Sequence, residues 1–274
     1  MVSNFFLSQW GASANAVLLL ALRLSVIFMM TPILYAMSIP TVVRVLLVLA
    51  LSVALSAGLQ PQAPVPMDAA ALVQAALAEM AIGMTMALGI LVAFAAFSLA
   101  GHMLDIQIGF GISQVFDPLS RRNLPILTSA FNQIAVVVFF LVNGHHALLR
   151  GIAFSLEQFP LGAGWSYEHA APAVFAQVAG LFGLAFALAA PVVFCVLLVE
   201  FALGVVARNL PQMNMFAMGI PVKIVVGLIA LAFWFLGIGG VMMRVYASIY
   251  TSWNDMLGLP AATLQEPILW LSKT

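Results

Sequence analysis

Long apolar stretches alternate with short polar or proline-containing breaks along most of the chain. Apolar runs of about 18 residues or more, the length at which a helix crosses a membrane, cover approximately residues 14–37, 42–59, 69–99, 124–142, 173–206 and 224–243. Prolines, glycines and polar residues fill the intervening stretches and are typical of turns and surface connections. The pattern therefore predicts six helical blocks and an all-α fold.

The composition narrows the class of protein. Of the 274 residues, 64% are hydrophobic and only 7% are charged, whereas soluble domains carry about 25% charged residues. We therefore expect an integral membrane protein or a chain buried in a larger assembly. Nine basic residues balance nine acidic ones, and no basic run is present. This charge distribution excludes a nucleic-acid-binding protein.

Several residues within the apolar runs add further expectations. Cys195 is the single cysteine, which excludes an intrachain disulfide and a thiolate metal cluster. No basic residue precedes Arg23, so the N-terminus lacks the basic region of a signal peptide, and we expect the first block to remain in the mature protein. Pro191 lies inside the fifth block and predicts a kink. Alanine and glycine are dense in the third and fifth blocks, which favours close helix packing.

Five charged residues lie within or at the ends of the apolar blocks, namely Arg23, Glu79, Asp105, Glu200 and Arg208. A charge at the centre of a bilayer costs on the order of 3 kcal/mol, so each should face protein, water or an opposite charge. One hypothesis pairs Arg23 with Glu79 across neighbouring helices. Glu200 and Arg208 lie about 12 Å apart along a common helix axis, so we expect each to find its partner elsewhere.

Two other classes of function share some of these features. An intramembrane enzyme would draw on His102, Asp105 and Glu200, but no zinc-binding HExxH pair, nucleophile elbow or phosphate-binding loop is present. We interpret these residues as polar groups at helix ends and turns. A small-molecule secondary transporter would also use intramembrane charges and broken helices. We find no convincing inverted repeat to support that alternative.

The segment IGFGISQVFDP, residues 108–118, is unusual among the breaks because it combines glycines with phenylalanines. Non-helical backbone at membrane depth is tolerated only where protein covers it or a water-filled cavity adjoins it. A loop bordering a pore is the functional interpretation, and a plain connecting turn is the alternative.

Three separated motifs resemble one known family. Glu200, Gly204 and Arg208, followed by PQMNMF at 211–216 and GIPVKIVVGL at 219–228, closely resemble the signature of the FliR family of flagellar export-gate proteins and their injectisome counterparts. NGHHALL at 143–149 is similar to that family's middle segment, and residues 109–118 are similar to its central loop. The resemblance covers residues 1–259, whereas 260–274 form a tail that does not align. The motifs look more flagellar than injectisome.

The resemblance implies a non-enzymatic role in type III protein export. It implies that one copy of the chain would join five FliP and four FliQ subunits in an all-α gate of bent helical hairpins, lifted largely out of the bilayer plane. Unfolded export substrates would pass through its centre, and FlhB-like and FlhA-like components would be further partners. The location implied is the bacterial inner membrane at the flagellar basal body, with no cofactor. Residues up to about 170 correspond to a FliP-like part, and residues from about 171 to 259 to a FliQ-like hairpin.

The resemblance also implies two groups of site residues. The first is a pore plug formed by Gly109, Phe110, Gly111, Ile112, Ser113, Gln114, Val115, Phe116, Asp117 and Pro118. Its apolar side chains would close the channel, and its glycines would permit movement. The second is a subunit interface with a hairpin tip formed by Glu200, Gly204, Arg208, Pro211, Gln212, Asn214, Phe216, Gly219, Pro221 and Lys223. In this interpretation, Pro211 and Pro221 enforce the bend at the tip.

Overall fold

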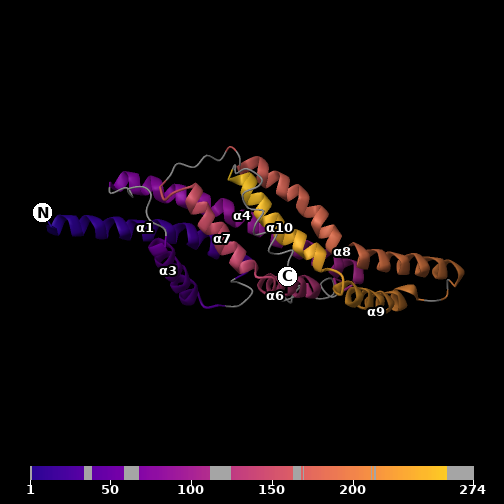
Figure 1. Cartoon of the computed structure of the whole chain (residues 1–274). Coiled ribbons are helices and arrows are strands. Elements are labelled where there is room, and N and C mark those ends of the chain that lie inside the picture. Colours follow the sequence, from indigo (N-terminus) through magenta and orange to yellow (C-terminus); the bar gives the residue numbers. More distant parts are fainter. Residues whose placement is uncertain are drawn as a thin grey trace. The chain divides into compact units, whose positions relative to one another are not determined.

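The computed structural model describes residues 2–33, 39–58, 68–111, 125–162, 168, 170–210, 212 and 214–257, with side chains omitted at 2–13, 58, 215 and 216. This described part contains eight α-helices and no strand, which confirms the all-α class (Figure 1). The helices are α1 (Val2–Met30), α3 (Thr41–Gly58), α4 (Ala69–Ile108), α6 (Ile126–Leu141), α7 (Gly144–Gln158), α8 (Ala170–Asn209), α9 (Met215–Phe235) and α10 (Gly239–Met256).

The prediction of six blocks was wrong at the C-terminal end and in the middle of the chain. The predicted block at 224–243 is broken between α9 and α10, where Gly237 N donates to Trp234 O at 2.9 Å. Helices α7 and α10 were not predicted. Both carry polar residues among the apolar ones, so neither forms an uninterrupted membrane-length run. Helix α4 also continues to Ile108, nine residues beyond the predicted end of its block at 99.

The break between α6 and α7 has a local cause in two consecutive residues. Asn143 has φ 57°, in the left-handed region that asparagine tolerates better than most residues. At Gly144, an added Cβ would lie 2.5 Å from the Phe139 ring. The apolar run at 124–142 therefore ends where an asparagine adopts the turn conformation and a glycine allows the next helix to start against an aromatic ring.

The described residues group into two compact units, each assembled from separate stretches of chain. The first takes its residues from within 1–92, 139–177 and 249–274, and the second from within 93–138 and 178–248.

The first unit is packed around Trp253 of α10. The indole Nε1 donates to Met86 O of α4 at 2.9 Å, and the side chain is almost completely buried. An added Cβ at Gly151 would lie 2.3 Å from the indole ring, and one at Gly89 would lie 2.9 Å from it. The two glycines therefore make the space that the largest side chain of the core occupies. Tyr250 also anchors α10 by donating to Gly144 O at 3.3 Å.

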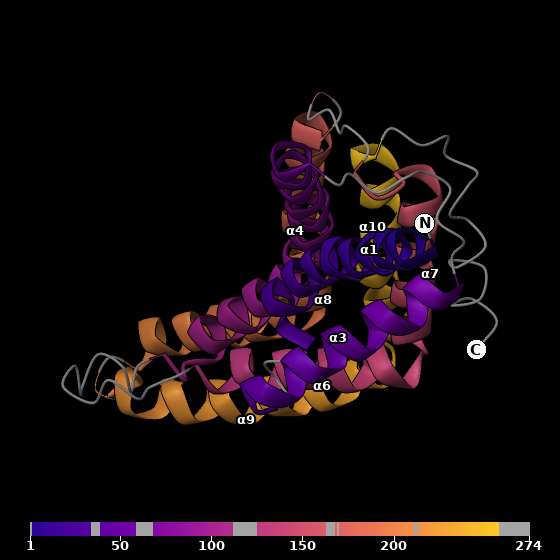
Figure 2. The same ribbon diagram turned by 90° about the vertical axis from the view of Figure 1, so that its left-hand side faces the viewer.

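The second unit is held together by aromatic residues and hydrogen bonds to backbone carbonyls. Tyr246 of α10 lies with its ring centroid 5.6 Å from that of Phe97 in α4, and its hydroxyl donates to Ala135 O of α6 at 2.7 Å. Trp234 of α9 donates to Leu188 O of α8 at 2.8 Å. Figures 1 and 2 show α9 running back along the second half of α8, so these two helices form a hairpin. Figure 1 also shows α8 changing direction along its length, and Pro191 lies within it.

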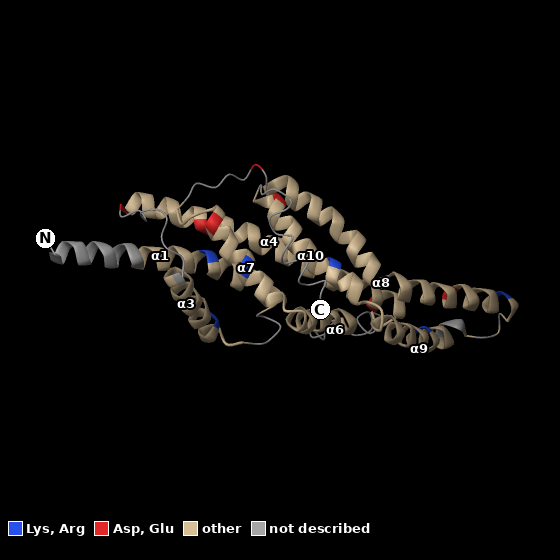
Figure 3. Ribbon diagram, in the orientation of Figure 1, with Lys and Arg blue, Asp and Glu red and all other residues tan. Residues whose placement is uncertain are grey.

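Within the described residues, three helices are long and apolar enough to cross a membrane, and charged positions are sparse along the ribbons (Figure 3). They are Ala69–Ile108, Ala170–Asn209 and Ala217–Phe235, and the pair formed by α6 and α7 makes a fourth if it counts as one broken span. Protein buries 61% of the most apolar window of α4, but only 28% of that of α8 and 11% of that of α9. These helices therefore have the length and composition of membrane spans, and the α8–α9 hairpin presents most of its apolar surface outward.

Candidate functional site

Two buried charged residues of the first unit form an ion pair. Arg23 Nε of α1 donates to Glu79 Oε2 of α4 at 2.5 Å, and both side chains have no exposed surface. The same guanidinium donates to Ser155 Oγ at 3.1 Å and to Phe159 O at 3.0 Å. Glu79 Oε1 accepts from Gly162 N at 3.1 Å. The hypothesis that Arg23 pairs with Glu79 is confirmed, and the pair ties α1 and α4 to α7 and the turn after it.

The second unit contains an ion pair on the α8–α9 hairpin. The Lys223 ammonium group of α9 donates to Glu200 Oε1 of α8, and the two side chains are 21% and 39% exposed. Gln107 Nε2 of α4 donates to the other Glu200 oxygen at 3.3 Å. Glu200 thus has two protein partners, as the cost of a charge in lipid requires. Glu200 pairs with Lys223 rather than with Arg208, which is exposed at the end of α8.

Two residues before Gln107, the Asp105 side chain accepts hydrogen bonds from the first turn of α6. Its Oδ1 accepts from Leu127 N at 2.9 Å, and its Oδ2 accepts from Thr128 N at 2.9 Å and from Thr128 Oγ1 at 2.8 Å. The first N–H groups of a helix have no partner within it, and the positive end of the helix dipole favours an anion. Asp105 therefore caps a helix other than its own.

Helix α4 ends against α9. An added Cβ at Gly227 would lie 2.7 Å from Ile108 Cγ1, so the Ile108 side chain packs directly on the α9 backbone. The next residue, Gly109, has φ 106°, in a region that strongly favours glycine. Gly109 N and Gly111 N donate to Asp105 O at 3.3 and 3.1 Å. Residues 105–111, which we call the α4 terminal turn, thus contact α6, α8 and α9 from one short segment.

The structure describes only the beginning of the predicted plug. Gly109, Phe110 and Gly111 belong to the α4 terminal turn, whereas residues 112–118 lie outside the described residues. The predicted segment therefore starts where α4 is fixed to three other helices of the same unit.

The predicted hairpin tip is shorter than expected. Helix α9 begins at Met215, after Asn214 Oδ1 has accepted from Ala217 N at 3.2 Å as an N-cap. Pro221 therefore lies inside α9, and its predicted role in the bend was wrong. In apolar surroundings the backbone strongly favours a helix, because its polar groups must be hydrogen-bonded within the protein. This preference outweighs the one backbone donor that Pro221 lacks. Gln212 lies exposed in the turn.

The remaining tip residues are only partly described. Pro211 lies outside the described residues, and Phe216 is described by its backbone alone. Gly204 faces open space, and an added Cβ at Gly219 would make an ordinary contact, 3.6 Å from Leu203.

Sequence reasoning missed the neutral partners in this site. Gln107 donates to Glu200 and Thr128 donates to Asp105, but neither residue was singled out. Gln107 carried a weak signal, because it is an amide only two residues from the predicted loop at 109–118. Gly227 lies within the matched motif GIPVKIVVGL, but nothing in the sequence indicates that Ile108 packs on it.

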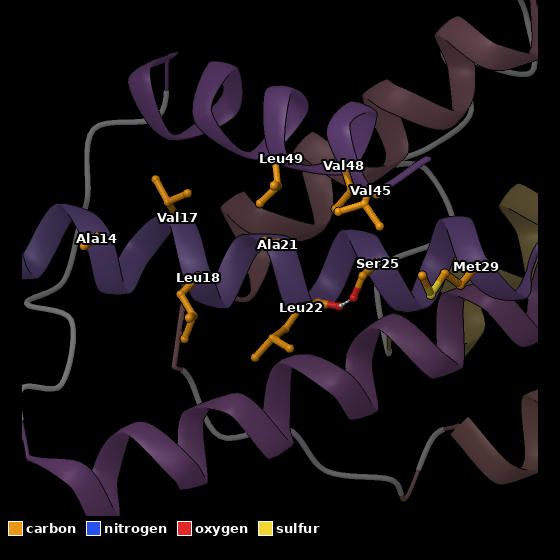
Figure 4. Close-up of a pocket in the computed structure, with 10 residues that line it drawn as sticks. All are labelled: Ala14, Val17, Leu18, Ala21, Leu22, Ser25, Met29, Val45, Val48 and Leu49. Atoms are coloured by element: carbon orange, nitrogen blue, oxygen red, sulfur yellow. Dashed lines mark hydrogen bonds between the residues drawn. The ribbon is translucent and has the colours of Figure 1, made fainter. Parts of the chain in front are cut away.

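No alternative chemical site emerges from the described residues. They contain no cluster of three His, Cys, Asp or Glu side chains that would hold a metal ion. A pocket of about 630 Å³ lies between α1 and α3 (Figure 4). Among its described lining residues, the one hydroxyl group, Ser25 Oγ, donates to Leu22 O. Figure 4 shows Val17, Val45 and Leu49 directed into the space between the helices. The pocket is an apolar surface without catalytic groups.

Comparison with known proteins identifies relatives over nearly the whole chain. The family model described as Bacterial export proteins, family 1, matches residues 14–249. The chain is 30% identical over 247 residues to the flagellar biosynthetic protein FliR of Bacillus subtilis, covering 89% of this chain and 95% of that protein. It is 27% identical over 224 residues to FliR of Escherichia coli, covering 82% and 85%. It is also 30% identical over 145 residues to the surface presentation of antigens protein SpaR of Shigella flexneri, covering 53% and 56%.

Proposed function

The chain belongs to the bacterial export proteins, family 1, and we propose that it is a structural and gating subunit of the flagellar type III protein export gate. The observation that carries the proposal is the family match across residues 14–249, which includes the α4 terminal turn and the whole α8–α9 hairpin. Its role in this proposal is non-enzymatic, because it shapes a path for unfolded substrates and performs no reaction on them.

Flagellar service is the proposal because two relatives that align over most of the chain are flagellar proteins. The flagellar relatives of Bacillus subtilis and Escherichia coli align over more than four-fifths of this chain. The SpaR protein of Shigella flexneri aligns over 53% of it. The flagellar basal body in the bacterial inner membrane is the proposed location.

The α8–α9 hairpin is the proposed interface with other subunits. It exposes large apolar side chains, among them Phe194, Phe201, Val225, Ile229 and Phe233. An apolar surface of this extent requires lipid or protein cover. We assign it to FliP-like and FliQ-like neighbours, five and four copies respectively around one copy of this chain. FlhB-like and FlhA-like components complete the proposed apparatus.

The segment at 109–118 is the proposed plug of the channel. Support comes from the α4 terminal turn, because Asp105, Gln107 and Ile108 fix the start of this segment to α6, α8 and α9. A plug needs a fixed base if its apolar residues are to return to the same place after each opening. Phe110 and the apolar residues that follow it would seal the channel by packing and by excluding water.

Deleting residues 109–118 from the assembled complex tests the gating role. The expected result is a membrane that leaks ions, measured as conductance in vesicles or planar bilayers. Replacing Phe110, Val115 and Phe116 by glycine should leak in the same direction while keeping the segment's length. As a control, Ser56→Ala removes a hydroxyl group that bonds Val53 O of its own helix α3, and it should leave conductance unchanged. Unchanged conductance on deletion would contradict the gating role and leave family membership intact.

A further inference from the structure

The pocket between α1 and α3, which we call the α1–α3 pocket, is long and narrow. Its α1 side runs from Ala14 to Met29, a length of about 22 Å at 1.5 Å per residue. Its volume of about 630 Å³ spread over that length gives a mean cross-section of about 29 Å². A helix with its side chains is about 10–12 Å wide, or about 80–110 Å² in cross-section. A hydrocarbon chain, whose atoms pack about 4 Å apart, is thin enough to lie inside.

The lining of the α1–α3 pocket is apolar and uncovered. Four of its larger side chains are between 42% and 50% exposed, namely Leu18, Met29, Val45 and Leu49. Ser25 Oγ already donates to Leu22 O of its own helix at 2.9 Å. Covering apolar surface is favourable, so the side chains of this pocket favour a ligand that is apolar along its length.

The pocket is continuous with an apolar outer face of α3. Val42, Leu46, Leu49 and Val53 recur at helical spacing, and each is at least 44% exposed. Leu49 belongs both to this face and to the pocket lining. A hydrocarbon chain can therefore pass from the surroundings of α3 into the pocket without crossing polar surface.

One cation stands at an end of the pocket. Arg44 is the only charged residue of α3, and it lies one helical turn before Val48, a lining residue on the same face. Figure 4 shows Leu49 near Ala21 and Val45 nearer to Ser25, so the first turn of α3 lies toward the Met29 end of the pocket. Arg44 Nε donates to Ile39 O at 3.0 Å, which holds the guanidinium beside the N-terminus of α3.

The charge of this region suits an anion. Residues 1–58 contain Arg23 and Arg44 but no acidic residue, and Arg23 is balanced by Glu79. A guanidinium has five N–H donors and binds phosphate groups strongly. The positive end of the α3 dipole attracts an anion to the same place. An apolar pocket with a cation at one end is complementary to an amphiphile that has a hydrocarbon tail and an anionic head.

We propose that the α1–α3 pocket binds one anionic phospholipid, with an acyl chain along α1 from Met29 toward Ala14 and the phosphate at Arg44. A phospholipid is the occupant because other helices of the chain have the length and composition of membrane spans, so phospholipid is the amphiphile that surrounds them. Such a site does not depend on the proposed role in export. Neither the proposed plug nor the proposed hairpin interface assigns it.

Native mass spectrometry of the full chain in mild detergent tests the head-group contact. The chain is titrated with dipalmitoyl phosphatidylglycerol, which is anionic, and separately with dipalmitoyl phosphatidylcholine, which has the same acyl chains and no net charge. The wild-type chain should retain one phosphatidylglycerol and prefer it about fivefold, because one cation near an anionic lipid contributes about 1 kcal/mol. Arg44→Gln should abolish this preference. Arg244→Gln, which removes an exposed cation of α10, should keep it.

Filling the pocket tests the acyl-chain contact. Ala21→Phe places a ring among the lining residues and should abolish retention of both lipids at the concentration that saturates the wild-type chain. Leu49→Phe repeats the test at a half-exposed lining position, where the added bulk does not disturb the core. Leu46→Phe is the matched control, because Leu46 lies on the same helix and does not line the pocket. That control should retain lipid as the wild-type chain does.

Four outcomes would overturn the proposal. A wild-type chain that retains no lipid, or one that retains as much as Ala21→Phe and Leu49→Phe, excludes the pocket as a lipid site. An unchanged preference in Arg44→Gln excludes the phosphate from Arg44. In the complex coexpressed with FliP-like and FliQ-like subunits, a photoreactive benzophenone side chain in place of Val45 should label phospholipid. Labelling of a protein segment instead would show that protein covers the pocket.

Discussion

Arg23 of α1 and Glu79 of α4 form an ion pair in which neither side chain has any exposed surface. Removing two charges from water costs more than their attraction returns unless further hydrogen bonds satisfy them. Ser155 Oγ, Phe159 O and Gly162 N provide these bonds. The pair therefore fixes how α1, α4 and α7 meet within the first unit.

Breaking this pair on one side should destabilise the chain strongly. Arg23→Met or Glu79→Leu leaves one buried charge without its partner and should lower the free energy of unfolding by about 3–5 kcal/mol. The double variant removes both charges and should lie closer to wild type. Arg208→Met, at an exposed site, should change it by less than about 0.5 kcal/mol. Denaturant unfolding in mild detergent measures all four, and a single variant as stable as wild type would contradict the assigned role.

A charge swap at the same pair should restore little stability. A glutamate at position 23 cannot donate to Phe159 O, and an arginine at position 79 cannot accept from Gly162 N. Arg23→Glu combined with Glu79→Arg should therefore stay at least about 2 kcal/mol below wild type, because buried polar groups remain unsatisfied. Full recovery in the same unfolding measurement would show that Coulomb attraction alone stabilises the junction.

The ion pair between Glu200 and Lys223 should matter for assembly. Lys223→Met leaves Glu200 without its cation on a hairpin that faces lipid or other subunits, at a cost on the order of 3 kcal/mol. The yield of complex after coexpression should fall accordingly. Exchanging the two charges should restore part of the yield, since the Gln107 amide can present its oxygen in place of its nitrogen. Equal yields for Lys223→Met and wild type would argue against this role.

The packing of Trp253 predicts which glycines tolerate a methyl group. Gly151→Ala should lower the free energy of unfolding by about 1–3 kcal/mol, because the new Cβ overlaps the indole ring. Trp253→Ala should cost about 3–5 kcal/mol by leaving a cavity. Gly180 of α8 faces open space, so Gly180→Ala should be neutral or stabilise by up to about 1 kcal/mol. Equal effects of the two alanine substitutions on thermal unfolding would exclude this account of the core.

A substitution at Gly204 should affect assembly of the complex without affecting folding of the chain. No atom of the described structure lies near the position of an added Cβ there, and small residues on membrane helices let another helix approach closely. Gly204→Leu should therefore leave the unfolding of the isolated chain unchanged while lowering the yield of complex. Val205→Leu, at the next exposed position, is the control of similar final size. Normal assembly of Gly204→Leu would remove Gly204 from the interface.

The apolar helices were predictable because a membrane segment must be long, continuous and apolar, and such a run can be recognised in the sequence itself. Helices α7 and α10 escaped prediction because they are amphipathic, so polar residues interrupt any apolar run of membrane length. Tyr246 and Tyr250 bond backbone carbonyls of neighbouring segments, and the sequence does not show which segments these are. Burial raises the pKa of both phenols, which are protonated donors at neutral pH even without that shift.

The charged members of the candidate site were predictable for a related reason. A charge in an apolar block is costly, so Asp105 and Glu200 drew attention before their partners were known. The neutral side chains of Gln107 and Thr128 cost far less free energy to bury, so their presence near the apolar blocks did not indicate a role. Pro221 was assigned to a turn because proline usually ends helices. The N-cap at Asn214 and the apolar surroundings outweigh that preference.

The mass of the native complex in mild detergent tests the central claim most directly. Coexpressed with FliP-like and FliQ-like subunits, the chain should purify in a single assembly of about ten subunits that contains one copy of it, and native mass spectrometry should resolve that stoichiometry. Lys223→Met should shift the population toward free chain. A monomer or small homo-oligomer from the wild-type chain under the same conditions would contradict the account and favour a secondary transporter.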